Sequence, residues 1–591
     1  MKGRIDVKTT QRLEVHDEPD NKFESFGRIV ICVLMLLVMG ILTMSSILHT
    51  TGMEIVAEGQ GYDTVINRLR EGLETVAYYN DNPITNIILL GVSVAVCFFV
   101  MPLLKKIPLW AEIAFIAAWT IVLGVIWVNS SMLAPSEDSF MVSDAAWRFS
   151  MDDYDYLANN NYFKYVPYQL GYVFFNEILI RGYSLFAEVE NFIFLQYVSV
   201  IMLAGAYIAV ILINKRLFKD ERVRHMTVFL LAFAAQPLIL TSFLYGIFPG
   251  LCIALWAVYF EIVYFQTDKL RYGIISAVLI AMASILKPNY MIALIAMMAI
   301  AFVKLFKRKK FVKDLVFMAA AVALTLSGSP AVKSMYESRS GVDLGDSIPY
   351  VSWISMGLSE AGNAPGWYNY VPALTNFEVN NFNAADASED SIENILTRIE
   401  YFNDNPQYAK DFFYRKFVSQ WNETSYQSIW NNKVRYQYEE KGSLAAWVCG
   451  DGEDTMKDYM DVYSLLIFTA ALAGIVGCLR SRRFLTATLP LMILGGVLYH
   501  LLAEAKSQYA IPYFIMMIGV AGYGIVLMYD FAAKKLQESG RSCKFFLQPE
   551  PVAVPAAEVA VTEDIPSAEE TAPEKPASEE IPAEEKTEAE S

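Results

Sequence analysis

Charged residues are scarce in this sequence of 591 residues. They make up 19% of the chain, whereas hydrophobic residues make up 55%. One soluble domain could not bury so large an apolar fraction, so the composition excludes an ordinary soluble protein and indicates a polytopic membrane protein. A helix needs roughly 20 apolar residues to cross a bilayer. Twelve apolar runs are predicted to cross: 29–48, 84–104, 109–128, 192–214, 226–245, 248–265, 272–286, 290–306, 312–330, 462–479, 484–502 and 510–529.

Ionisable residues are nearly absent from the centres of these runs. Glu112 and Glu261 lie near predicted cytoplasmic ends, and the polar candidate in the middle of a run is Gln236, beside Pro237. A proton- or ion-coupled transporter would be expected to carry more charge, because ionisable residues within a membrane are costly and usually functional. No repeat relates the two halves of the chain, which weakens a transporter built from duplicated bundles.

Motifs for metals, nucleotides and nucleic acids are also missing. The six cysteines and four histidines are scattered, without the spacing of a zinc site or a disulfide framework. No glycine-rich phosphate loop or nucleophile elbow is present. Glu137 and Asp138 could contact a divalent cation, but two adjacent carboxylates are weak evidence for one. We therefore expect no cofactor and no nucleic-acid partner, and a divalent metal is unsupported.

The negative charge is concentrated at the C-terminus. The formal net charge is −16, and residues 551–591 contribute −10 of it, with twelve acidic residues and two lysines. This stretch is rich in Glu, Pro and Ala and has no aromatic residue, so it is predicted to be disordered. The acidic balance therefore says little about a substrate.

Lysine and arginine predict the orientation, since loops that stay in the cytoplasm are enriched in them. With twelve crossings, every basic cluster falls on one face and both termini are cytoplasmic. The first run lacks a small-residue cleavage site after it and is expected to remain as an anchor. The predicted organisation is a cytoplasmic segment at 1–28, a transmembrane core at 29–330 with an outer loop at 129–191, an extracytoplasmic domain at 331–461, further spans at 462–530 and a cytoplasmic tail at 531–591, disordered from about residue 550.

The two long outer loops are expected to carry the function. Residues 170–186 are apolar but interrupted by Asn176, Glu177 and Arg181, so we predict an amphipathic helix on the outer leaflet and not another span. The second loop, 331–461, contains five tryptophans and is predicted to form a small, partly helical domain. Its strongest helical patterns cover 391–401 and 408–420.

Acidic and basic candidates lie on the predicted outer side. Asp138 and Asp144 belong to an acidic cluster at the start of the first loop, where a carboxylate could take a proton from an attacking hydroxyl. The alternative is a solvated acidic loop. Lys287 and Lys506 are the only basic residues in the short outer turns and could bind a phosphate group. The alternative for them is contact with ordinary lipid headgroups.

Several short motifs resemble one enzyme class when taken in their order along residues 29–530. They are Asp138 in the first loop, Val166–Gly171, Trp353–Leu358 with Gly366–Asn369, Gln420–Thr424 with Ser428–Trp430, and Glu504–Tyr509. This order resembles the GT-C class of polyprenyl-phosphate-sugar-dependent glycosyltransferases. Within that class it is most similar to bacterial relatives of the protein O-mannosyltransferases and of the aminoarabinose transferases.

The resemblance implies an all-α integral membrane fold of about 12 helices, with an interfacial helix and a small extracytoplasmic domain. It implies an inverting, metal-independent hexosyl- or pentosyltransferase in the cell membrane. The donor would be a polyprenyl-phosphate-linked sugar, and the acceptor a hydroxyl of an extracytoplasmic glycan, lipid or protein. Asp138 would be the base, with Asp144 in reserve, and Glu504, Lys506 and Tyr509 would lie with Lys287 at the donor phosphate. The substrate-lining candidates are Tyr165, Tyr168, Gln169, Trp353 and Trp421.

The sequence departs from this class in two ways. An additional hairpin, formed by the first two spans, precedes the span that leads to Asp138. Ser507 and Gln508 replace the more usual arginine before the tyrosine, which leaves the phosphate ligand open. Two other functions stay as alternatives: a transporter or flippase of a lipid-linked saccharide, and a membrane scaffold whose acidic tail recruits cytoplasmic partners.

Overall fold

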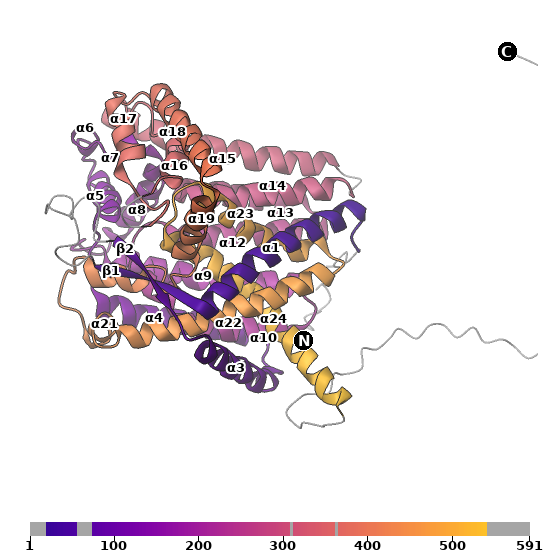
Figure 1. Cartoon of the computed structure of the whole chain (residues 1–591). Helices are drawn as coiled ribbons and strands as arrows, with labels where there is room; N and C mark the ends of the chain where they lie inside the picture. The colour runs from indigo at the N-terminus through magenta and orange to yellow at the C-terminus, as the bar shows by residue number, and fades with distance from the viewer. Residues whose placement is uncertain (1–18, 56–73, 308–310, 361–363, 540–591) are drawn as a thin grey trace, which may run out of the picture. The chain divides into compact units, whose positions relative to one another are not determined.

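The chain forms a bundle of long helices with smaller elements gathered at one end (Figure 1). The structure is a computed structural model, and it describes residues 19–55, 74–307, 311–360 and 364–539. The tail predicted to be disordered and most of the predicted N-terminal segment lie outside these residues.

Ten helices among the described residues are long and apolar enough to cross a membrane, which confirms a multi-pass, predominantly α-helical membrane protein. They are α1 (Lys22–Leu48), α3 (Pro83–Val100) with η1 (Met101–Leu104), α4 (Leu109–Ser131), α9 (Ile193–Leu217), α12 (Ile247–Thr267), η3 (Pro288–Tyr290) with α14 (Met291–Leu305), α15 (Phe311–Ser340), α22 (Glu453–Arg480), η5 (Phe484–Ala487) with α23 (Thr488–Leu502), and α24 (Ile511–Glu538).

Two of the twelve predicted runs differ from these ten. The run at 272–286 is a shorter apolar helix, α13 (Leu270–Leu286). The run at 226–245 is not one helix, because it divides into α10 (Glu221–Ala232) and α11 (Ala235–Leu240). Pro237 explains the break, since it has no N–H for the carbonyl four residues earlier and its ring clashes with that carbonyl. In contrast, α15 continues through Pro330 to Ser340, ten residues beyond the predicted end of that run.

Small residues allow the central helices to approach closely. On α24, a Cβ at Gly524 would lie 1.7 Å from the backbone oxygen of Ala470 on α22. Such contacts between small residues are the usual means by which helices pack in a membrane, where apolar surface alone gives no preference for another helix over lipid. α24 is buried along most of its length, whereas α3 is largely exposed and lies at the edge of the bundle.

The two predicted outer loops form short elements at the same end of the bundle, on the left in Figure 1. The first loop contains α5 (Asp138–Ser150), α6 (Tyr156–Asn159), α7 (Tyr162–Tyr165), η2 (Pro167–Gln169) and α8 (Leu170–Tyr183). The second contains α16 (Tyr350–Gly357), η4 (Val371–Thr375), α17 (Asn376–Val379), α18 (Ala384–Asp404), α19 (Pro406–Trp421), α20 (Ser428–Val434) and α21 (Ser443–Val448). The helices predicted within 170–186, 391–401 and 408–420 are confirmed by α8, α18 and α19.

The buried carboxylate of Glu177 inside α8 is paired with charged and polar side chains. Glu177 is buried and pairs with Arg181 at 2.9 Å and with Arg339 of α15 at 3.4 Å. The hydroxyl of Tyr336 also donates to its carboxylate at 2.5 Å. The polar interruptions that argued against a further span therefore join α8 to α15. The position of α8 on a bilayer surface stays a prediction.

A two-stranded antiparallel sheet was not predicted. β1 (His49–Ile55) pairs with β2 (Glu74–Asn80), and His49 lies opposite Asn80. The backbone N–H of Thr51 donates to the oxygen of Asn422 at 3.2 Å, so the hairpin packs against the end of α19. The first predicted hairpin of spans thus carries a short sheet, on the side that the sequence predicts to be outside.

Candidate active site

A cavity of about 550 Å³ lies among the elements at this end of the bundle. Its wall includes the start of α5, the segment from α7 to η2, the turn after α11, the turn between α13 and α14, α16, and the turn between α23 and α24. Its charged residues are Glu137, Asp138, Lys287, Arg435, Glu504 and Lys506, and its aromatic residues include Tyr162, Tyr165, Tyr168, Phe243, Tyr245, Tyr350, Trp353, Tyr368, Tyr499 and Tyr509.

Asp138 begins α5 and its side chain is exposed on the cavity wall. Its Oδ2 accepts a hydrogen bond from the hydroxyl of Tyr245 at 2.9 Å, and Gln169 Nε2 donates to that same hydroxyl at 2.8 Å. Burial, together with the negative charge of Asp138, raises the pKa of Tyr245 well above its ordinary value. Tyr245 therefore stays protonated and donates to the carboxylate, which fixes the direction of the Asp138 side chain.

Lys287 lies where α13 ends and is buried against two aromatic rings. Its Nζ donates to the backbone oxygen of Tyr245 at 3.1 Å, and it lies 3.7 Å from the ring centroid of Tyr245 and 5.6 Å from that of Tyr509. Burial lowers the pKa of Lys287 to about 7, although the carboxylates of Asp138 and Glu504 favour its charged form. An anion bound beside it would favour the ammonium further.

The turn between α23 and α24 carries Glu504, Lys506 and Tyr509. It is held by hydrogen bonds to the second predicted outer loop, residues 331–461, which is called the second outer segment from here on. The N–H of Ala505 donates to the oxygen of Gly366 at 2.8 Å, and Ser507 Oγ donates to the buried carboxylate of Glu423 at 2.7 Å. The hydroxyl of Tyr509 donates to Glu504 Oε2 at 3.4 Å. These contacts hold the turn at the cavity edge.

Lys416 of α19 stabilises the start of the same turn by hydrogen bonds to backbone oxygens. Its buried ammonium donates to the backbone oxygens of Leu501 at 3.0 Å and Ala503 at 2.8 Å, and also to that of Gly357. These carbonyls lie at the ends of α23 and α16, where helices leave such groups without an internal partner. The Lys416 side chain thus caps the C-terminal ends of α16 and α23.

The side of the cavity formed by the second outer segment is aromatic. Tyr350 and Trp353 are three residues apart on α16 and so project from the same helix face. Trp353 packs with Tyr165 in a small apolar cluster, and the Tyr165 hydroxyl donates to Glu378. Tyr350 is exposed, and Tyr368 is half-buried. The wall offers flat rings with polar edges, which suits the apolar faces and hydroxyls of a sugar.

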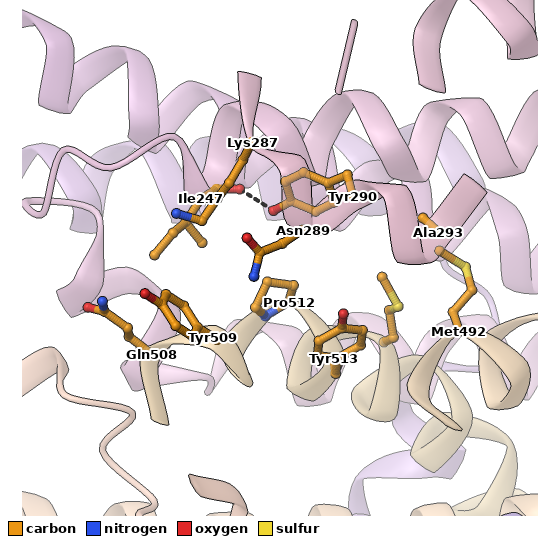
Figure 2. Close-up of a pocket in the computed structure, with 11 residues that line it drawn as sticks. Ile247, Lys287, Asn289, Tyr290, Ala293, Met492, Gln508, Tyr509, Pro512 and Tyr513 are labelled. Atoms are coloured by element: carbon orange, nitrogen blue, oxygen red, sulfur yellow. Dashed lines mark hydrogen bonds between the residues drawn. The ribbon is translucent and has the colours of Figure 1, made fainter. Parts of the chain in front are cut away.

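A smaller cavity of about 20 Å³ adjoins the main one (Figure 2). The two share Lys287, Asn289, Gln508 and Tyr509. The other residues of the small cavity come from α12, α14, α23 and α24 and are mainly apolar: Ile247, Tyr290, Ala293, Met492, Pro512, Tyr513 and Met516. The hydroxyl of Tyr290 donates to the oxygen of Ile247 at 2.5 Å, drawn as a dashed line in Figure 2. Lys287 therefore lies between a polar cavity and an apolar one.

Most of the predicted site residues line the main cavity. These are Asp138, Lys287, Lys506, Tyr509, Glu504, Tyr165, Tyr168, Gln169 and Trp353. Asp144 is not on its wall, because α5 turns this carboxylate away to pair with Arg148 at 3.0 Å. The prediction that Trp421 lines the substrate path is corrected: it is buried in the core, where it packs against Phe417 and Tyr513.

Sequence reasoning missed many residues of this wall, among them Tyr350, Tyr368, Arg435 and Tyr245. Arg435 belongs to the second outer segment, where nothing in the local sequence distinguishes it from the other charged residues. Tyr245 was assigned to a predicted span. Its position directly before Gly246, which begins the predicted Gly246–Phe248 turn, together with Pro237 earlier in the run, was the available signal that the helix ends sooner.

Within the described residues, no three His, Cys, Asp or Glu side chains gather as they would to hold a metal ion. Independence of metal and cofactor stays a prediction.

Comparisons with known proteins find no matching protein-family model and no matching curated protein. Two similar solved structures are of oligosaccharyltransferases from Archaeoglobus fulgidus. One is the archaeal oligosaccharyltransferase AglB in complex with an inhibitory peptide and a dolichol-phosphate (TM-score 0.38), and the other is an oligosaccharyltransferase in the apo form (TM-score 0.37). Each is 12% identical over 74% of this chain, which in turn spans 52% and 53% of their lengths, about half. A likeness at this level assigns no role to any residue here.

Proposed function

We propose that this protein is a membrane glycosyltransferase of the GT-C type that moves a sugar from a polyprenyl-phosphate donor to a hydroxyl acceptor on the extracytoplasmic side. The observation that carries the proposal is one cavity that holds an accessible carboxylate, Asp138, together with two lysines, Lys287 and Lys506. Its volume of about 550 Å³ is that of an ordinary small-molecule site.

The reaction needs one base and a stabilised leaving group. The acceptor oxygen attacks the anomeric carbon while the bond from that carbon to the phosphate oxygen breaks, and the electron pair leaves with the phosphate. Asp138 takes the proton of the attacking hydroxyl. A displacement of this kind inverts the anomeric configuration, and general-base help of this kind is typically worth about 10²- to 10⁴-fold in rate.

Lys287 and Lys506 would stabilise the phosphate. The charge on the leaving phosphate grows as the bond breaks, and fixed cations in a site shielded from water stabilise such charge strongly. Lys287 suits this role, because its buried side chain lies on the wall of the main cavity, beside the place that a phosphate headgroup would occupy. Glu504 and Tyr509 would orient Lys506 and the sugar.

The aromatic wall would bind the acceptor. Tyr350, Trp353 and Tyr368 line the cavity from the second outer segment. The transferred sugar is proposed to be a hexose or pentose, and the acceptor a glycan, lipid or protein of the bacterial envelope.

Sugar release from the lipid tests the proposal. The full chain in vesicles would be given undecaprenyl phosphate that carries labelled hexoses or pentoses, and the label lost from the lipid would be measured. Asp138→Asn is expected to slow release by about 10²- to 10⁴-fold. The matched variant Asp144→Asn is expected to stay close to wild type, because this carboxylate pairs with Arg148 outside the cavity.

Two results would contradict the proposal. If Asp138→Asn kept full activity, Asp138 could not be the base. If the wild-type protein moved the intact lipid-linked sugar across the bilayer without breaking the sugar–phosphate bond, the protein would be a flippase and not a transferase.

A further inference from the structure

The segment that follows α20 runs beside the chain that leads into α5. The backbone N–H of Ala134 donates to the oxygen of Tyr436 at 2.9 Å, and the N–H of Tyr438 donates to the oxygen of Met132 at 2.8 Å. Between these bonds the two stretches form an antiparallel bridge. The second outer segment is therefore joined by its backbone to the residues just before Asp138, although some 300 residues separate them in the sequence.

The side chain of Arg435 adds further contacts between the same two stretches of chain. It is buried, and its Nε donates to Asn431 Oδ1 at 2.6 Å within its own segment. Its Nη1 donates to Ser136 Oγ at 2.9 Å and forms an ion pair with Glu137 Oε2 at 2.9 Å. The two residues that precede Asp138 are thus both held by one guanidinium, whose planar donors suit this geometry.

The backbone at Glu137 needs such support. Its φ is +52°, in the left-handed region that residues other than glycine rarely adopt. The same residue is the N-cap of α5, and its backbone oxygen accepts from the N–H groups of Phe140 and Met141 at 3.0 Å. The conformation at Glu137 therefore decides in which direction α5 starts, and with it the direction of the Asp138 carboxylate.

We propose that Arg435 is a positioning residue for Asp138: by holding Ser136 and Glu137, it keeps the first turn of α5 in the conformation that aims the carboxylate at Tyr245 and into the cavity. The second outer segment then contributes to the reaction through the base as well as through the aromatic wall. This inference rests on the proposed function for its kinetic consequence, but its structural part can be tested without any turnover.

Hydrogen exchange measures the structural part. The full chain in lipid nanodiscs would be followed by mass spectrometry on a peptide that covers residues 137–145. Arg435→Gln is expected to speed exchange there at least tenfold. Glu137→Gln keeps Arg435 in place and is expected to give a smaller increase in the same peptide, which guards against a folding failure of the arginine variant. Lys433→Gln is the matched control, because it breaks another ion pair of the same segment, with Glu453 at 2.6 Å, away from the cavity wall.

Kinetics measures the consequence. In the sugar-release assay, Arg435→Gln is expected to lower kcat by ten- to a hundredfold and to leave the KM for donor and the binding of undecaprenyl phosphate within twofold. Unchanged exchange at 137–145 in both variants, or an equal increase in Lys433→Gln, would overturn the positioning role. A wild-type protein that released no sugar would overturn the proposed function instead, and the exchange result would still stand.

Discussion

Lys287 is a buried residue whose protonation would make the binding of a phosphate depend on pH. It lies at the end of α13 between two tyrosine rings, and this burial lowers the pKa of its ammonium group to about 7. Below that pH the side chain is a cation, and above it the side chain becomes increasingly neutral. A phosphate would bind the cationic form better, because only this form supplies a full charge beside it.

The affinity for undecaprenyl phosphate is therefore expected to fall as pH rises from 7 to 9. The second ionisation of a phosphate monoester lies near pH 6, so the ligand keeps its charge over this range. Lys287→Met should bind more weakly at pH 7, by tenfold or more, and with little dependence on pH. Lys433→Met, outside the cavity, should follow the wild type. Titration by calorimetry in nanodiscs measures both, and a wild-type affinity that is constant from pH 7 to 9 would contradict the account.

The individual site residues could be predicted from sequence only where they broke a local pattern. Lys287 and Lys506 stood out as cations in short outer turns that otherwise lack them, and both line the cavity. Asp138 belonged to an acidic cluster ten residues after the end of an apolar run. Arg435 broke no pattern, because its partners Ser136 and Glu137 are far away in the chain. Trp421 resembled an acceptor-binding aromatic but faces the core.

Among the elements, α8 and α13 approach each other more closely than ordinary side chains allow. A Cβ on Gly171, the second residue of α8, would lie 1.9 Å from the backbone oxygen of Ile285, two residues before Lys287. This glycine lets η2 and α8 carry Gln169 to Tyr245 while α13 ends beside the same tyrosine. The contact between α8 and α13 therefore sets the distance between Gln169 and Lys287, which approach Tyr245 from the two helices.

Gly171→Ala is expected to push these helices apart and to destabilise the fold by about 1–3 kcal/mol, the usual effect of overpacking. Sugar release should fall with it, since Lys287 and the Asp138–Tyr245 pair would separate. Gly182→Ala on the same helix is the control. No atom lies within 4 Å of its added methyl group, so it should be neutral or slightly stabilising. Thermal unfolding in one detergent compares them, and equal Tm values would refute the close-contact explanation.

At the scale of the whole molecule, the predicted cytoplasmic basic clusters meet at one end of the bundle. Arg28 pairs with Asp20 at 2.8 Å and donates to the oxygen of Cys478 at 3.1 Å, and Lys304 pairs with Glu24 at 2.6 Å. The start of α1 and the end of α24 lie at this end in Figure 1, opposite the elements that form the cavity. Segments far apart in sequence thus share one face, as the distribution of lysine and arginine predicted.

Cysteine labelling tests which face is outside. In a background without Cys449 and Cys543, both replaced by serine, Tyr436→Cys is expected to react with an impermeant maleimide on intact cells, because Tyr436 is highly exposed beside the cavity end. Lys534→Cys, exposed after the last span, should react only after the membrane is permeabilised. The opposite pattern would place the cavity in the cytoplasm and remove an extracytoplasmic acceptor.

The sequence by itself determined the position and approximate ends of most membrane helices, the shared face of the basic clusters and several helices of the predicted outer loops. Each of these depends on a periodic or compositional signal within some 20 neighbouring residues. Only the tertiary structure decided that Asp138, Lys287 and Lys506 line one cavity, that Asp144 and Trp421 do not, and that Arg435 holds the turn before Asp138. The cavity and the contacts of Arg435 join residues that lie well over a hundred positions apart, and the direction in which Asp144 and Trp421 point depends on how their helices pack. A pattern of neighbouring residues does not encode either of these.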